Sequence, residues 1–127
     1  MEGIEKRVEE FTVDGKNFVY IDFSDFKVIE DCVALIEIIK PVISKYPENS
    51  IYTITNIGGV RFDTGIKEAF SEYMQSNAPY VKYGAVIGLD GVKKMFMRII
   101  LKMSGRSNIE LAFSKKTAID VLLKHDD

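Results

Sequence analysis

The sequence predicts an α/β domain built on one mixed, mostly parallel sheet with packed helices. Three observations support this prediction. A chain of 127 residues with 46% hydrophobic residues is long enough for one core and too short for two. An Asp-Gly pair between two β-type segments predicts a hairpin at the start. After the hairpin, strand-like segments alternate with segments of helical periodicity, which is typical of parallel sheets.

The hairpin consists of two strands, expected over residues 7–13 and 17–23. Asp14-Gly15 joins them, and this dipeptide suits a turn in which both positions need a positive φ. The second strand is rich in aromatic and β-branched residues, which favours a central place in the sheet.

Helical periodicity begins at Ile29 and is expected to extend to Lys45. Apolar residues recur there at spacings of three and four and form one stripe: Ile29, Cys32, Leu35, Ile36, Ile39, Val42 and Ile43. A loop at residues 46–49 follows, and a third strand is expected over 50–55.

The second half of the chain continues the alternation. Asp63 or Thr64 can cap a helix that ends at Asn77-Ala78-Pro79. The later elements are a strand over 82–88, a helix over 90–103 capped by Asp90, a strand over 109–113 and a helix capped by Ser114. The predicted order is ββαβαβαβα, in a single domain over 1–127 whose core covers about 13–123.

Composition argues against several classes of function. The formal net charge of −2 argues against nucleic acid as a partner. One Cys and one His cannot supply a zinc site, and no cofactor-binding loop occurs, so no metal and no cofactor are expected. His125 lies in an end segment that we expect to fray, which leaves no nucleophile with a histidine base and predicts no catalytic residues. Without a membrane-spanning run or a signal peptide, the protein is expected to be cytoplasmic.

The loop over residues 56–65 is the first candidate binding site. Its glycines permit a tight turn, and the N-terminus of a helix follows with free N–H groups, so it could bind an anion. In the other interpretation the glycines only make the turn, and Asp63 or Thr64 only caps the helix. The candidate residues are Asn56, Gly58, Gly59, Arg61, Asp63, Thr64 and Gly65.

The expected helix over 90–103 is unusually basic. Residues 81–106 carry six basic side chains against one acidic, a net of +5, whereas the rest of the chain carries −7. A helical wheel predicts a buried face formed by Val92, Phe96, Ile99, Ile100 and Met103. It predicts a basic surface of Lys93, Lys94, Arg98 and Lys102, with Met95, Met97 and Leu101 exposed among these residues.

A basic helix face that also exposes Met and Leu has several interpretations. It suits an acidic partner protein or anionic lipid, because thioethers adapt their shape and charges steer association. It equally suits a homodimer interface or an ordinary solvated surface. The tyrosines are a further open case, because they can line a ligand pocket or belong to the core: Tyr20, Tyr52, Tyr80 and Tyr83.

The segment from Thr55 to Ile66 reads Thr-Asn-Ile-Gly-Gly-Val-Arg-Phe-Asp-Thr-Gly-Ile, between the third strand and the second helix. It resembles the D-x-S-G-V-x-F-I-D-S-S-G-L loop at the same place in STAS domains of anti-sigma-factor antagonists, which share the predicted element order. The loop of this chain is one residue shorter between Phe62 and Gly65 and has one hydroxyl where the motif has two.

More closely, the chain is similar to the compact SpoIIAA-like (STAS/SEC14-type) family from about Val13 to Leu123. The stretches that carry this likeness are Tyr20-Ile21-Asp22-Phe23, Ile39-Lys40-Pro41, Arg61-Phe62-Asp63-Thr64, Pro79-Tyr80-Val81-Lys82 and Ser104-Gly105-Arg106.

The resemblance implies a non-catalytic module that binds a protein partner through the 56–65 loop and adjacent helices. In the antagonists a kinase phosphorylates a Ser or Thr at the start of the second helix, which breaks partner binding, and Thr64 stands at that position. The alternative is a small-molecule or lipid-binding carrier domain that uses an aromatic pocket and the basic helix over 90–103.

Overall fold

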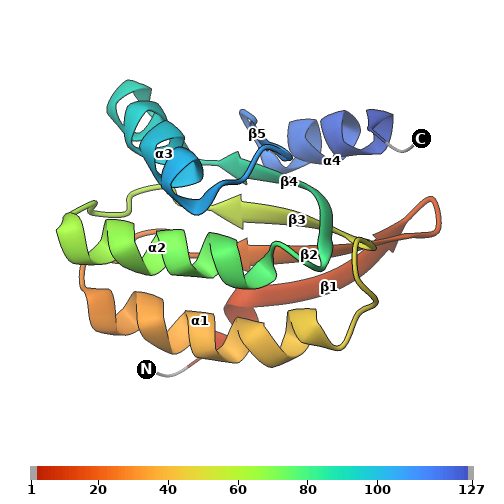
Figure 1. Ribbon diagram of the computed structural model, residues 1–127, viewed down its shortest axis with the longest axis horizontal. Helices are drawn as coiled ribbons and strands as arrows, with labels where there is room; N and C mark the ends of the chain where they lie inside the picture. The colour runs from red at the N-terminus through yellow and green to blue at the C-terminus, as the bar shows by residue number, and fades with distance from the viewer. Residues whose placement is uncertain (1–2, 126–127) are drawn as a thin grey trace.

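The computed structural model describes residues 3–125 as one sheet with helices on both faces (Figure 1). The strands are β1 (Val8–Val13), β2 (Lys16–Asp22), β3 (Ile51–Asn56), β4 (Val81–Ile87) and β5 (Ile109–Leu111). The helices are α1 (Ile29–Ser44), α2 (Thr64–Asn77), α3 (Gly91–Ser104) and α4 (Lys115–Lys124), preceded by a 3₁₀ turn, η1 (Ile4–Arg7). Apart from η1, this is the predicted order of elements.

The strands lie in the sheet in the order in which they occur in the chain, β1-β2-β3-β4-β5. The β1–β2 pair is antiparallel, and the later pairs are parallel. The hairpin turn confirms the Asp-Gly prediction, since φ is 52° at Asp14 and 77° at Gly15. The predicted mixed, mostly parallel sheet is therefore confirmed.

Successive side chains of each strand point to opposite faces of the sheet and pack into two separate hydrophobic cores. Helices α1, α2 and α3 cover one face of the sheet, where β2 contributes Val19 and Ile21. Helix α4 covers the other face, where Ala118 and Leu122 pack against Phe18 and its neighbours in β3 and β4. The alternation follows from the two-residue period of a strand.

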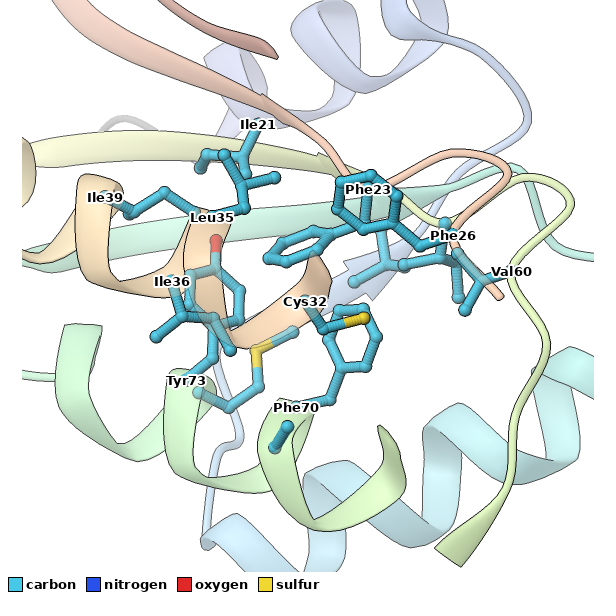
Figure 2. Close-up of a cluster of buried hydrophobic side chains, with 14 of the residues drawn as sticks. Ile21, Phe23, Phe26, Cys32, Leu35, Ile36, Ile39, Val60, Phe70 and Tyr73 are labelled. Carbon is cyan, nitrogen blue, oxygen red and sulfur yellow. The ribbon is translucent and has the colours of Figure 1, made fainter. Parts of the chain in front are cut away.

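The larger core is centred on aromatic rings between the sheet and helices α1 and α2 (Figure 2). The ring centroid of Phe23 lies 4.7 Å from that of Phe70 and 5.4 Å from that of Tyr73, in edge-to-face arrangements. Cys32 is fully buried in the same cluster. Burial raises the pKa of its thiol to about 11, so Cys32 is a core residue.

Three helices begin at the predicted capping residues. The Asp63 and Asp90 carboxylates each accept a hydrogen bond at 2.9 Å, from the N–H groups of Ile66 and Lys93. The Ser114 hydroxyl accepts one at 3.1 Å from Thr117 N–H. Asp63, not Thr64, is therefore the cap of α2, which leaves Thr64 as the first residue of the helix.

The C-terminal segment differs from the prediction in two places. Strand β5 ends at Leu111, two residues before the predicted end, and Phe113 is 93% exposed. His125 was expected in a frayed segment. Instead its ring stacks on Tyr83 with 4.4 Å between centroids, and its Nε2 hydrogen bonds to Glu110. These contacts hold the end of α4 against the sheet.

Candidate functional site

The 56–65 loop lies at the carboxyl edge of the parallel strands and is bonded to the connections on both sides. The backbone N–H of Ile57 donates to the Ile87 carbonyl at 3.0 Å. The Gly58 carbonyl accepts from Asp25 N–H at 2.8 Å, and Arg61 N–H donates to the Phe26 carbonyl at 3.0 Å. The N–H groups of Ile57 and Arg61 are therefore not available to bind an anion.

Contacts within the chain account for Asn56, Gly58 and Gly59. Asn56 Oδ1 accepts from Gly58 N–H at 2.9 Å, and its Nδ2 donates to Tyr20 Oη at 3.0 Å. Gly59 has φ +71°, and a Cβ there would lie 2.1 Å from Asp25 Oδ1. The positive φ and the close approach of Asp25 explain why residue 59 is a glycine, and no bound ligand is needed to explain it.

The other predicted loop residues lie on or near the surface. Arg61, Asp63 and Thr64 are exposed, and Gly65 is half-buried close to the Ile29 side chain of α1. Asp63 caps α2, whereas the Arg61 guanidinium and the Thr64 hydroxyl make no hydrogen bond or ion pair within residues 3–125. These two groups are the part of the loop that is free to meet a partner.

The structure corrects the predicted orientation of α3. Three residues expected in the core are exposed: Val92, Ile99 and Met103. Two expected on the surface face inward, since Met97 is fully buried and Leu101 is half-buried. The helix is rotated by roughly a quarter turn from the predicted wheel. Apolar residues occupy most of its circumference, so periodicity alone did not select the face.

This orientation leaves a line of large apolar side chains in solvent, here named the α3 stripe. Its members and their exposed fractions are Val92 65%, Met95 64%, Ile99 45% and Met103 56%. Beside it, the Phe96 ring lies 6.1 Å from the ring of Phe62, which belongs to the 56–65 loop. Helix α3 therefore contacts the 56–65 loop through Phe96.

The predicted basic surface is partly rearranged by the same rotation. Lys94, Arg98 and Lys102, here named the basic row, are exposed, whereas Lys93 is half-buried. Within the described part of the chain, none of these four side chains makes a hydrogen bond or an ion pair. The basic row therefore carries its positive charge unneutralised by the fold.

A cavity of about 410 Å³ lies between the C-terminal halves of α1 and α2. Tyr73 and Tyr80 line it together with apolar residues of α1, such as Ile39. Of the four tyrosines considered from the sequence, Tyr80 alone lines this cavity; Tyr52 is buried on the opposite face of the sheet. None of its described lining residues comes from α3, so this cavity is not the expected aromatic pocket beside the basic helix.

Arg106 ties the end of α3 to the end of α2, a role that the sequence did not indicate. Its Nη1 donates to the Met74 carbonyl at 2.6 Å and to Asn77 Oδ1, and its Nε donates to Asn108 Oδ1 at 3.0 Å. Burial lowers the pKa of Arg106. Burial also raises the pKa of nearby Tyr73 to about 12, so the Tyr73 hydroxyl is protonated near neutral pH.

The described residues form neither a metal site nor a membrane-spanning helix. No group of three or more His, Cys, Asp or Glu residues that could hold a metal ion occurs between residues 3 and 125. In the same part of the chain, every helix is too short or too polar to cross a bilayer.

The chain was compared with known proteins. No protein-family model matches the sequence, and no curated protein matches it. Among solved structures, the chain is similar to an uncharacterised protein of the DUF3478 family with a SpoIIAA-like fold from Shewanella loihica PV-4. The TM-score is 0.68 over 91% of each chain, at 11% sequence identity. We conclude that the chain has the SpoIIAA-like fold that the sequence resemblance implied.

Proposed function

We propose that the protein is a non-catalytic interaction module that binds an acidic partner protein. The observation that carries this proposal is the α3 stripe, four large apolar side chains in line on one exposed helix face. A contiguous exposed apolar surface of this kind is typical of interaction sites. The adjoining basic row has no internal counter-charge, and an acidic partner would supply one.

The loop extends the proposed interface. Phe62 connects it to α3, and the exposed Arg61 guanidinium adds a cation at the same edge of the sheet. Thr64 is the proposed switch residue, because its hydroxyl is exposed and free at the start of α2. A phosphate there would lie beside the Asp63 carboxylate and would change the charge of the interface from positive towards negative.

The interface is tested by co-purification from the protein's own host, with native mass spectrometry of the retained complex. Met95→Glu combined with Ile99→Glu is expected to abolish the complex, because it places two charges in the apolar contact. Glu72→Gln on the exposed side of α2 is the matched surface control and is expected to retain it. A complex that survives the double variant would contradict the proposal, and a dimer lost in the variant would identify a second copy as the occupant.

The switch has its own test in the purified complex. Thr64→Asp is expected to weaken partner binding more than Thr64→Ala, because only the aspartate adds negative charge. Isothermal titration calorimetry compares the two dissociation constants. Equal affinities for the two variants would remove Thr64 from the proposal and leave the interface intact.

A second candidate function is binding of a lipid or small molecule. The cavity between α1 and α2 offers a small apolar site, and α3 combines an apolar stripe with basic side chains, which suits an anionic membrane surface. Vesicles of phosphatidylcholine with and without phosphatidylglycerol test it by flotation. Binding is expected to need the anionic lipid, to fall with salt and to fall in Lys93→Glu plus Lys94→Glu; binding unchanged in that variant would count against it.

A further inference from the structure

A groove of about 350 Å³ lies between α3 and the segment that joins β5 to α4. Its lining residues are Leu89, Lys94, Arg98, Leu111, Ala112 and Phe113. Leu89 follows the carboxyl end of β4, and Ala112 follows the carboxyl end of β5. Ligands of open α/β sheets bind outside the carboxyl ends of the strands, so the groove lies where this architecture places a ligand.

One wall of the groove carries two positive charges. Lys94 and Arg98 are four residues apart on α3 and therefore share one side of the helix. Both side chains lack a hydrogen bond or ion pair within residues 3–125, and no acidic residue is among the described lining residues. Like charges at this spacing repel each other, so a bound anion would stabilise this side of the helix.

The rest of the groove is apolar and firmly placed. Leu89 and Leu111 are half-buried and pack against the larger core. The backbone N–H of Ala112 donates to the Val86 carbonyl at 2.9 Å, which fixes the segment that follows β5. Phe113 follows Ala112 with 93% of its surface exposed, so no packing within residues 3–125 explains an aromatic residue there.

We propose that this groove binds a small phosphate monoester that carries a flat apolar group. A monoester has close to two negative charges near neutral pH, which matches the two cations on the α3 wall. Arg98 can donate two parallel hydrogen bonds to phosphate oxygens, and Lys94 supplies the second charge. The flat group covers Leu89 and Leu111 and stacks on Phe113.

This site shares Lys94 and Arg98 with the basic row of the proposed partner interface. It differs from that interface in excluding the α3 stripe: the groove lies on the side of α3 that faces β5, and none of its described lining residues belongs to the stripe. Its volume is within the lower range of small-molecule sites, about 300–1,000 Å³. The proposal therefore adds a ligand to the module and does not depend on the partner experiment.

Phenyl phosphate is the probe for the test, followed by amide chemical shifts in ¹⁵N-labelled protein. Inorganic phosphate and phenol are titrated in parallel at the same ionic strength, because each supplies one half of the probe. Phenyl phosphate is expected to bind at least about tenfold more tightly than either, with the largest shifts at Leu89, Lys94 and residues 111–113.

Variants locate the site. Lys94→Gln plus Arg98→Gln is expected to weaken phenyl phosphate binding at least about tenfold, by removing both charges. Phe113→Ser is expected to reduce the affinity to that of inorganic phosphate. Lys102→Gln is the matched control, because Lys102 is an exposed cation of the same helix that does not line the groove. The altered side chains are exposed, and unchanged thermal unfolding verifies the fold.

Two results would overturn the proposal. If phenyl phosphate binds no more tightly than inorganic phosphate, or if Lys102→Gln weakens it as much as the double variant does, the cations act only as a diffuse positive surface. If phenyl phosphate does not bind but vesicles containing phosphatidic acid do, with loss in Phe113→Ser, the ligand is a lipid headgroup and not a small soluble ester.

Discussion

Helices α2 and α3 lie on the same face of the sheet and are equally long, with 14 residues each, yet they use their apolar residues differently. Helix α2 buries an unbroken apolar face: Ile66, Ala69, Phe70, Tyr73 and Met74. Helix α3 buries Met97 and Ile100 fully and leaves the α3 stripe in solvent. The fold alone accounts for the composition of α2, whereas it leaves half of α3 exposed, and this is the surface to which we propose that a partner binds.

Replacing three methionines by alanine, one at a time, tests this comparison through the free energy of unfolding. Met74→Ala in α2 and Met97→Ala in α3 are each expected to lower the free energy of unfolding by about 2–5 kcal/mol, because each leaves a cavity in the core. Met95→Ala in the α3 stripe is expected to change it by less than about 0.5 kcal/mol. Urea denaturation measures all three, with equal m-values as the check that the unfolding reaction is the same.

A large loss of stability in Met95→Ala would break the comparison. It would mean that the α3 stripe is packed in solution, and a concentration-dependent midpoint would then identify a second copy as its cover.

The start of α2 gives a prediction of intermediate size. Asp63→Ala is expected to destabilise the fold by about 1 kcal/mol, because it removes the acceptor for the Ile66 N–H group. Thr64→Ala is expected to stay within about 0.5 kcal/mol, since its hydroxyl is exposed and unbonded within the described chain. Chemical denaturation compares the two, with Asp63→Asn as the control that preserves a capping oxygen. Equal losses in the two alanine variants would show that Thr64 shares the capping role.

The sequence predicted the order and type of the main elements because turns, caps and periodicity are local signals. The Asp14-Gly15 turn and the caps at Asp63, Asp90 and Ser114 are examples. It did not predict the rotation of α3, because that helix is apolar around most of its circumference and its orientation depends on packing with α2 and the sheet. Spacing predicts a helix there but cannot choose between two apolar faces.

The sequence predicted a turn in the 56–65 loop, but it did not predict why glycines are required there. That reason is non-local, since a Cβ on Gly59 would lie 2.1 Å from Asp25 Oδ1. The loop also constrains Gly88 in the neighbouring β4–α3 connection, where a Cβ would lie 2.4 Å from the Gly58 nitrogen. The 350 Å³ groove was also beyond prediction, because it joins side chains of α3 to a segment that follows β5.

The smallest expected effect on stability comes from a surface ion pair outside helices α2 and α3. Glu10 Oε1 lies 2.7 Å from Lys45 Nζ and accepts a hydrogen bond from Tyr46 Oη at 2.5 Å. The bonds from Lys45 and Tyr46 hold the pKa of Glu10 below its ordinary value of 4.5. Since the folded pKa is the lower one, this contribution to stability is present above about pH 4.5 and is lost as the pH falls through the folded pKa.

Glu10→Gln is therefore expected to flatten the acid side of the stability profile. Because the pair is largely solvent-exposed, the difference is expected to be about 0.5 kcal/mol or less. Thermal unfolding between pH 3 and pH 7, about the range over which such carboxylates titrate, measures it. Glu37→Gln removes the carboxylate of a surface pair within α1 and is the matched control. A profile identical to the unsubstituted protein would show that solvent screens the Glu10 contacts completely.

The strand order β1-β2-β3-β4-β5 has a consequence for the kinetics of folding. Each strand pairs with the one that precedes it in the chain, so the sheet can grow from its N-terminal edge during synthesis. The β1–β2 hairpin closes first through a two-residue turn, and each later loop closure spans a single helix. The face covered by α4 is the last to be completed. Until residues 115–124 emerge, Phe18, Tyr52 and Ile54 have no helix above them. The partly synthesised chain is therefore expected to be most prone to aggregation just before α4 docks.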